Sequence, residues 1–342
     1  MEVSELSRKN LIFASIAFAF LLVVFLSLGL GLFLVSPADK EGKEEIFVVP
    51  QGRSLREIAQ DLENRHLVKS KTLFVLWTRI MGYSKDIKSG EYTLSAAMAP
   101  AEILEKLRLG RILTHSVTIP EGATREQIAD LLQEKDLARR DVFLSLTEDP
   151  AVLKKYDLPG LSLEGYLFPD TYHFGRGIPP SMIIDSMLKR FRQMVGPLGD
   201  QAEETGMGME EIVILASIVE KETGHPDERS LIASVFLNRL RQGMRLQSDP
   251  TVIYGLENFD GKIRKKDLLE KTPYNTYVIH GLTPGPICNP GLESIKAVIS
   301  PATSDYLYFV SRNDGSHHFS KTLSEHNRAV DRYQRRKGKK TP

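Results

Sequence analysis

The chain has 342 residues, which is enough for two or three globular parts. Its 45 basic and 44 acidic residues leave a net charge of +1, which gives no reason to expect a nucleic-acid partner. Because Cys288 is the only cysteine, an intramolecular disulfide and a cluster of thiolate metal ligands are both excluded.

The first predicted element is a membrane-spanning helix. Residues 10–38 contain no charged residue, and residues 11–35 form an apolar stretch that exceeds the roughly 20 residues needed to span a bilayer. A cleaved signal peptide is the alternative, because Ser36-Pro37-Ala38 resembles a cleavage site. Basic residues flank the stretch on both sides and do not orient it, but long downstream domains translocate largely regardless of such charges. We therefore predict a cytoplasmic tip and a transmembrane anchor over residues 1–38. The rest is expected on the periplasmic or extracytoplasmic side of the bacterial inner (cytoplasmic) membrane.

An internal repeat follows a short charged linker. The run Val49-Pro50-Gln51-Gly52 has a counterpart 70 residues later in Ile119-Pro120-Glu121-Gly122. Each copy predicts a strand, a turn and an amphipathic helix, which Ser54 or Thr124 caps. The pattern resembles the LysM module, a small strand–helix unit that binds N-acetylhexosamine polymers; two structural subdomains without sugar binding are the alternative. We predict a LysM-like α+β domain over residues 39–114 and a second repeat-like α+β part over residues 115–205.

Residues 161–174 read LSLEGYLFPDTYHF and combine aromatic side chains with the carboxylates of Glu164 and Asp170. Sugar rings stack their apolar faces on aromatic rings, and their hydroxyls bond to acids. The segment therefore predicts a sugar contact, with a loop whose aromatics fill the core as the alternative. A helix is expected next, over residues 180–194.

The most apolar stretch of the globular part, residues 211–224, predicts a buried helix. Lys221, Gly224 and Pro226 are typical of a helix end. Glu220 follows the apolar run and lies about 40° around the helix from Ala216, on the buried side. Burial and the negative end of the helix dipole both disfavour its anion, as suits a general acid near neutral pH. A structural carboxylate paired with an arginine is the alternative.

The remainder, residues 206–342, is predicted to form the α+β catalytic part that carries Glu220. A helix capped by Asp227 is expected to run to Gln242. A turn at residues 246–250 should start a short helix through Tyr254, and residues 271–291 should form a long irregular loop. Residues 306–312 alternate like a strand, and a turn should return the chain at His318-Phe319.

Several chemistries lack a motif in this sequence. It contains no nucleophile elbow, no His-Glu-x-x-His metal motif and no glycine-rich phosphate loop, so we predict no metal and no cofactor. An acidic residue with amides, hydroxyls and aromatic patches suits carbohydrate cleavage. Glycosidases ordinarily use two carboxylates, but one suffices if the sugar supplies the nucleophile, as the C6 hydroxyl of muramic acid can.

Four motifs together resemble the endolytic murein transglycosylase (YceG-like) family: EGYLFPDTY at 164–172, SIVEKET at 217–223, LQSDPTVIYG at 246–255, and YNTY with GLTPGPICNPG within 274–291. The resemblance implies a membrane-anchored lyase that cuts the MurNAc–GlcNAc β-1,4 bond of nascent peptidoglycan strands. It also implies 1,6-anhydro-MurNAc ends and a role in terminating strand elongation. The resemblance makes Glu220 the expected acid and base. Glu222 is the nearest competitor, two residues on and on a different face of the helix.

The same motifs supply the predicted substrate contacts. The partners we expect are glycan strands, the membrane and peptidoglycan synthases, and a non-catalytic scaffold for synthases or a hydrolase remain as alternatives. The side chains predicted to hold the substrate are Glu164, Tyr166, Arg239, Gln247, Ser248, Asp249, Tyr254, Tyr274 and Asn275.

Overall fold

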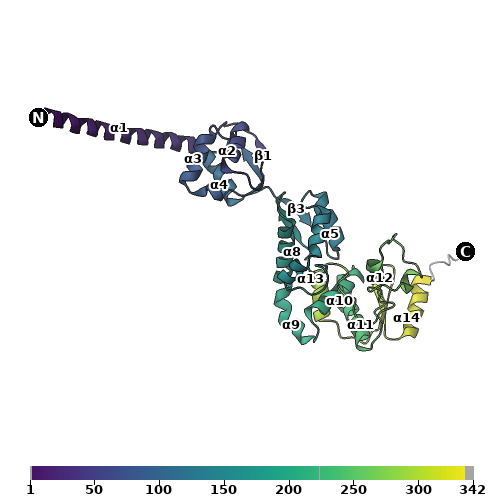
Figure 1. Cartoon of the computed structure of the whole chain (residues 1–342). Helices are drawn as coiled ribbons and strands as arrows, with labels where there is room; N and C mark the ends of the chain where they lie inside the picture. The colour runs from purple at the N-terminus through teal and green to yellow at the C-terminus, as the bar shows by residue number, and fades with distance from the viewer. Residues whose placement is uncertain (1, 223, 336–342) are drawn as a thin grey trace. The chain divides into compact units, whose positions relative to one another are not determined.

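A computed structural model describes residues 2–222 and 224–335, with side chains from residue 13 onward (Figure 1). The chain forms two compact units. Unit 1 contains residues 1–115 and 175–178, and unit 2 contains residues 116–174 and 179–342. Both of the predicted parts 115–205 and 206–342 fall mostly within unit 2, so a division at residue 206 stays a prediction.

Unit 1 combines a two-stranded antiparallel sheet with helices. Phe47 and Tyr92 face each other across the sheet and are buried with Phe74, and the sheet pairing is continuous. The elements of unit 1 are α1 (Glu2–Val35), β1 (Glu44–Val49), α2 (Leu55–Asn64), α3 (Lys71–Ile80), η1 (Tyr83–Lys85), β2 (Gly90–Ser95) and α4 (Pro100–Leu109).

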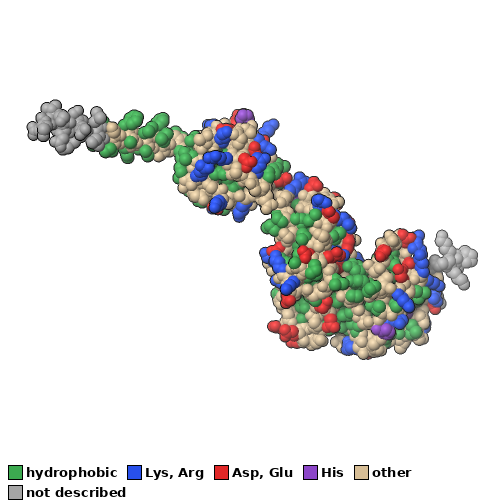
Figure 2. All heavy atoms as spheres, in the orientation of Figure 1, with side chains coloured by type: hydrophobic (Ala, Val, Ile, Leu, Met, Phe, Trp, Pro, Cys, Tyr) green, Lys and Arg blue, Asp and Glu red, His purple; other side chains and the backbone are tan. Residues whose placement is uncertain are grey.

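Helix α1 joins this core directly. Its segment Phe13–Val35 is long and apolar enough to cross a membrane, and Figure 2 shows hydrophobic side chains over its described surface. In its last turn, however, Phe33 and Leu34 are each only 8% exposed and belong to the core cluster of unit 1. The helix also contacts α3 and α4. The end of α1 is therefore packed into the folded unit.

Unit 2 begins with a second small sheet and a set of helices. β3 pairs with β4, and the backbone N–H of Ile119 extends the pairing by donating to the carbonyl of Asp170 at 2.9 Å. The elements are β3 (His115–Thr118), α5 (Arg125–Glu134), α6 (Arg140–Thr147), α7 (Pro150–Lys155), β4 (Thr171–Phe174), α8 (Pro180–Val195), η2 (Gly196–Leu198) and α9 (Gly199–Glu204).

The rest of unit 2 is arranged around one central helix, α10 (Met209–Glu222). It contacts three other helices of the unit, α11, α12 and α13. The remaining elements are η3 (Pro226–Glu228), α11 (Arg229–Arg241), α12 (Asp249–Gly255), η4 (Asp267–Leu269), α13 (Leu292–Ile299), β5 (Tyr308–Ser311), β6 (His317–Ser320), α14 (Leu323–Val330) and the π-turn η5 (Asp331–Arg335).

The mixture of helices and small sheets agrees with the predicted α+β class, while the likeness of residues 39–114 to LysM stays a prediction. The helices of the two repeat copies begin in the same way, because Ser54 and Thr124 each form a reciprocal capping box. The predicted cap at Asp227 is wrong, because Pro226 starts a 3-10 turn and α11 begins only at Arg229.

Replacing Thr124 with Ala should weaken α5 by about 1 kcal/mol, because its hydroxyl accepts from the Gln127 backbone N–H at 3.3 Å. Hydrogen exchange should then speed up in α5 and stay unchanged in α2. Ser54→Ala is the matched control and should show the reverse pattern. Equal acceleration in both helices would contradict the local role of each cap.

Candidate functional site at the end of α10

The site is built on the carboxyl-terminal turn of α10. Every residue from Ile212 to Val219 is buried, so the polar groups that follow this run must find partners on other elements. Glu220 and Glu222 are two residues apart, which places them about 200° apart around the helix. The two carboxylates therefore face different surroundings.

Glu222 faces a cavity of about 430 Å³. Its half-buried carboxylate accepts a hydrogen bond from Ser248 Oγ at 2.5 Å. Polar side chains from two other segments share the cavity wall, and the side chain of Asp249 brings a second carboxylate to it. The residues lining the cavity are Glu222, Arg239, Leu246, Gln247, Asp249, Tyr277, Tyr308, Phe309, Val310, Ser311, His317, Leu323, His326, Val330 and Gln334.

The surroundings of Glu222 favour a bound proton. Burial is the main cause and raises the pKa of the Glu222 carboxyl to about 7, against an ordinary value of 4.5. The charge of Asp249 acts in the same direction, whereas the Ser248 hydrogen bond and the charge of Arg239 partly oppose it. A carboxyl that titrates near neutrality can both give and take a proton.

The segment 246–249 is held rigidly in the cavity wall. Gln247 has a φ of 52°, a left-handed conformation that is uncommon for a residue with a side chain. Its backbone N–H donates to the carbonyl of Thr276 at 3.2 Å, and the Ser248 N–H donates to Thr276 Oγ1 at 2.9 Å. The Tyr277 hydroxyl donates to Asp249 at 2.6 Å, so the YNTY motif supports the LQSDP motif.

Arg239 is fixed from the other side of the same cavity. Its Nε donates to the carbonyl of Leu307 at 2.6 Å and its Nη1 to that of Leu246 at 2.8 Å, while its guanidinium lies 5.2 Å from the ring centre of Tyr308. These bonds tie α11 to the loop before α12 and to the β5–β6 hairpin. Arg239 thus positions the cavity wall while keeping its positive charge near Glu222.

Glu220 has a different environment. Its side chain is 6% exposed and lies 3.4 Å from Arg229 Nη2, and its second oxygen accepts from the Gly291 N–H at 3.0 Å. Arg229 also lies 3.5 Å from Glu121, whose pKa is raised by burial and by the charge of Glu220. Glu220 thus has an arginine partner, as the structural alternative requires, and its role as the acid stays a prediction.

Gly291 lies directly beside this cluster, because a side-chain carbon there would overlap the half-exposed carboxylate of Glu121, which would have to move. Gly291 therefore approaches Glu121 and Glu220 with its backbone alone.

The other predicted contacts divide into two groups. Arg239, Gln247 and Asp249 line the cavity with Glu222, and Ser248 bonds to it. The remaining five do not line this cavity, so their role as substrate contacts stays a prediction: Glu164, Tyr166, Tyr254, Tyr274 and Asn275.

Glu164 illustrates the second group. It is 1% exposed and accepts hydrogen bonds from the Arg125 N–H at 3.2 Å, from Asn289 Nδ2 at 2.7 Å and from the Tyr254 hydroxyl at 3.3 Å. Burial raises its pKa to about 8. Asn275 is fully buried and donates to the carbonyl of Glu270 at 2.7 Å. Both residues hold loops together inside unit 2.

Tyr166, Tyr254 and Tyr274 also take part in packing. The ring of Tyr166 is buried against that of Phe191, with centroids 5.2 Å apart. The rings of Tyr254 and Tyr274 lie 4.8 Å apart. The aromatic side chains of the EGYLFPDTY motif are thus mostly core residues, the alternative weighed for that segment.

The sequence did not single out the aromatic and histidine residues of the cavity, among them Tyr308 and His317. The signal for Tyr277 was present in the YNTY motif, whereas Tyr308 and His317 come from the β5–β6 hairpin, whose placement depends on long-range packing. His317 Nδ1 lies 2.7 Å from Glu228. Within residues 13–222 and 224–335 no group of three or more His, Cys, Asp or Glu side chains is suited to hold a metal ion.

Comparison with known proteins identifies the family. The sequence model of the YceG-like family matches residues 47–332. The chain therefore belongs to the YceG-like family, as the motifs predict.

An endolytic murein transglycosylase of Bacillus subtilis is 34% identical over 323 residues, which cover 89% of either chain. One of the same description from Streptococcus pneumoniae is 30% identical over 86% of this chain and 59% of its own length. The crystal structure of a YceG-like protein from Listeria monocytogenes aligns with a TM-score of 0.59 and 35% identity, covering 84% of this chain and 100% of that one.

The raised pKa of Glu222 makes the stability of the protein depend on pH. A folded-state pKa of about 7 means that the contribution is fully present below pH 4.5 and is lost as the pH rises through 7. Glu222→Gln keeps an acceptor for Ser248 and removes the buried charge. We expect this variant to unfold at the same temperature as the wild type at pH 4, and to be more stable by roughly 2–3 kcal/mol at pH 8.

Glu325→Gln is the matched control in the same unit. Backbone N–H groups of Thr322 and Lys321 lower the pKa of Glu325, so its contribution to stability is present above the ordinary pKa and lost in acid. The Glu325→Gln protein should thus be less stable than the wild type at pH 8. A Glu222→Gln protein that loses stability at pH 8 would contradict the assignment of a buried, costly charge.

Proposed function

We propose that this protein is an endolytic lytic transglycosylase that cuts the glycan strands of peptidoglycan. Family membership supports the reaction class, since its relatives in Bacillus and Streptococcus are endolytic murein transglycosylases. The observation that carries the proposal is the Glu222 carboxyl, with a pKa of about 7, on the wall of a cavity that also presents amide, acidic and aromatic side chains.

In the reaction, Glu222 acts first as an acid and then as a base. Its proton goes to the oxygen of the β-1,4 bond between MurNAc and GlcNAc, and the bond from that oxygen to C1 of MurNAc breaks. The C6 hydroxyl of the same MurNAc then bonds to C1 and gives its proton to the Glu222 carboxylate. The products are a free GlcNAc 4-hydroxyl and a 1,6-anhydro-MurNAc end. Glu222 has regained the proton that it gave in the first step.

The cavity wall supplies what this chemistry needs besides the proton. Gln247 can bond to sugar hydroxyls or an N-acetyl group from a fixed backbone, and Tyr308 and Phe309 offer apolar ring faces to the sugar. The positive charge of Arg239 lies near Glu222 and stabilises its anion between the two proton transfers. Asp249 sits where it can stabilise the positive charge that develops on the sugar ring.

We assign the acid to Glu222 in preference to the Glu220 favoured by sequence. Glu220 is engaged by Arg229 and by the Gly291 N–H, and it does not line the cavity. Glu222 lines the cavity and has a hydroxyl as its partner. In this proposal Glu220 is a structural residue that ties α10 to α11 and to the 285–291 loop.

A hydrolase is the second candidate, because Asp249 provides the second carboxylate that a glycosidase uses. In that reaction water would attack C1, and the product would be a reducing end. The hydrogen bond from Tyr277 to Asp249 leaves the transglycosylase as the better-supported assignment, since it occupies one oxygen of the would-be base.

The apolar helix α1 is proposed to anchor the enzyme in the cytoplasmic membrane with units 1 and 2 on the outer side. Burial of Phe33 and Leu34 in the core supports an anchor over a cleaved signal sequence, since cleavage after Ala38 would remove core side chains. An enzyme held there would meet strands as the synthases release them. We propose that its cuts terminate elongation of nascent strands.

The assignment is tested by two single variants incubated with purified glycan strands. Glu222→Gln removes the transferable proton, so we expect release of 1,6-anhydro-muropeptides to fall at least ~100-fold. Glu220→Gln retains an acceptor for Gly291 and should keep most of the activity. If Glu222→Gln is as active as the wild type and Glu220→Gln is inactive, the general acid is Glu220.

Mass spectrometry of the same products separates the two candidate reactions, because a hydrolase leaves ends that are heavier by one water than anhydro ends. We expect anhydro ends in the wild-type digest. Strand binding without new ends would instead support the non-catalytic scaffold.

The wild-type enzyme should also lose activity in mild alkali. Because the free enzyme must hold the Glu222 proton, kcat/KM should be level below pH 7 and fall about tenfold per pH unit well above it. The measurement is kcat/KM on soluble glycan chains from pH 5 to 9. A profile without a break near pH 7 would argue against a carboxyl acid with this pKa.

A further inference from the structure

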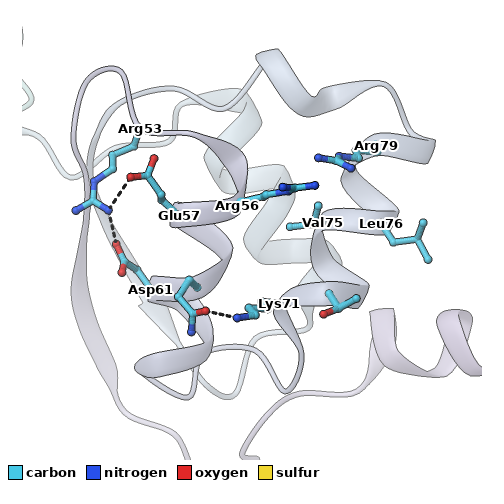
Figure 3. A pocket seen from close by; sticks show the side chains of 10 residues that line it. Arg53, Arg56, Glu57, Asp61, Lys71, Val75, Leu76 and Arg79 are labelled. Atoms are coloured by element: carbon cyan, nitrogen blue, oxygen red, sulfur yellow. Dashed lines mark hydrogen bonds and ion pairs between the residues drawn. The ribbon is translucent and has the colours of Figure 1, made fainter.

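Unit 1 has a pocket of about 560 Å³ between α2 and α3 that the proposed function does not use (Figure 3). Basic side chains outnumber acidic ones in its lining by four to two, and Val75 and Leu76 add an apolar surface. The residues lining the pocket are Arg53, Arg56, Glu57, Gln60, Asp61, Lys71, Thr72, Val75, Leu76 and Arg79.

Two of the basic side chains are exposed and have no protein partner within the described part of the chain. Arg53 lies 3.7 Å from Glu57 and 3.6 Å from Asp61, so it uses both acidic groups of the pocket. In contrast, no ion pair or hydrogen bond joins the side chain of Arg56 or Arg79 to another residue within the described part of the chain. Figure 3 shows the two guanidinium groups directed toward each other from α2 and α3. Two like charges in one pocket repel, and an anion between them would offset that cost.

The face of α3 beside these arginines is unusually apolar for a surface. Leu76 is 47% exposed and Ile80 61%, and Leu76 neighbours both Arg79 and Ile80 on the helix surface because they follow it by three and four residues. Met81 is also exposed just beyond the helix. Apolar side chains that alternate with arginine on one helix face are typical of a surface at the lipid–water boundary.

The attachment of unit 1 to the apolar helix α1 supports a membrane as the partner of this face. α1 contacts α3, and its last turn is packed into the core of unit 1, so no flexible spacer separates the apolar helix from the folded unit. The half-buried Trp77 of the same helix packs against the core of unit 1 and so reports on the position of α3. A unit attached in this way must lie against the head groups of the bilayer that α1 enters.

We propose that unit 1 binds the phosphate groups of anionic phospholipids through Arg56 and Arg79, with Leu76, Ile80 and Met81 inserted beside them. Planar guanidinium groups bind phosphate oxygens in pairs, which suits two free arginines that face one pocket. This inference depends on the proposed role of α1 as an anchor, and it adds a second, lipid-selective contact. Its consequence is a fixed orientation of unit 1 on the membrane.

Trp77 provides the probe, since it is the only tryptophan in the chain. The full-length protein is reconstituted into vesicles of phosphatidylcholine alone or of phosphatidylcholine mixed equally with phosphatidylglycerol, both with bromine on the acyl chains near the head group. We expect Trp77 quenching to be about twofold stronger in the anionic vesicles, because the arginines draw α3 onto that surface. Arg56→Gln with Arg79→Gln should abolish the difference between the two lipids.

Arg111→Gln is the matched control, because Arg111 is an exposed arginine of unit 1 outside the pocket. It should behave as the wild type. Circular dichroism of the double variant excludes unfolding as the cause of any loss. Equal quenching in both lipids, or an unchanged double variant, overturns the proposal.

Inorganic phosphate distinguishes the two sources of a phosphate group. If phosphate in solution changes Trp77 emission in neutral vesicles as strongly as the anionic lipid does, the site binds a soluble anion and the lipid assignment falls. Failure of the protein to enter vesicles at all would overturn the anchor and this inference together. A wild-type protein that releases anhydro-muropeptides but shows no lipid selectivity would overturn this inference alone.

Discussion

The burial of α10 is the constraint on which the rest of unit 2 depends. Ser217 is the only polar residue within the buried run 212–219, and it satisfies itself by donating to the carbonyl of Ile214 at 2.7 Å and accepting from the N–H of Ile287 at 3.0 Å. Cys288 adds a contact to the carbonyl of Ser217 at 3.3 Å. The interior of the helix thereby fixes the backbone of the 285–291 loop. That loop in turn determines which groups meet the carboxylates at the end of α10.

The side chain of Asn289 connects the 285–291 loop to the start of unit 2 by hydrogen bonds. Asn289 Nδ2 donates to Glu164 and to the carbonyl of Ala123, and its Oδ1 accepts from the N–H of Leu167. The Gly122 N–H donates to the carbonyl of Asn289, so the turn of the second repeat copy is attached as well. Three motifs far apart in the sequence are thus joined through buried hydrogen bonds, each of which costs free energy if its partner is removed. These hydrogen bonds give the three segments a structural role within unit 2.

The sequence contains enough local information for most elements but not for the orientation of the site. Periodic apolar residues and turn signals suffice for α8, α10 and the β5–β6 hairpin, and the Ser54 and Thr124 caps follow from the repeat. Which of Glu220 and Glu222 faces a cavity is set by residues 25 or more positions away, since Ser248 and Gly291 come from separate loops. The same holds for the EGYLFPDTY motif, because composition cannot separate aromatics that grip a sugar from aromatics that fill a core.

The two carboxylates of α10 show why position on a helix alone is a weak guide to chemistry. Both follow the same buried run and the same helix dipole, so local physics treats them alike. They differ in their partners: a guanidinium and a backbone N–H contact Glu220, whereas Glu222 accepts from the Ser248 hydroxyl and lines the cavity. An acid must have room for the atom that receives its proton, because transfer requires hydrogen-bond contact. In the proposed reaction this contact is made between Glu222 and the glycosidic oxygen.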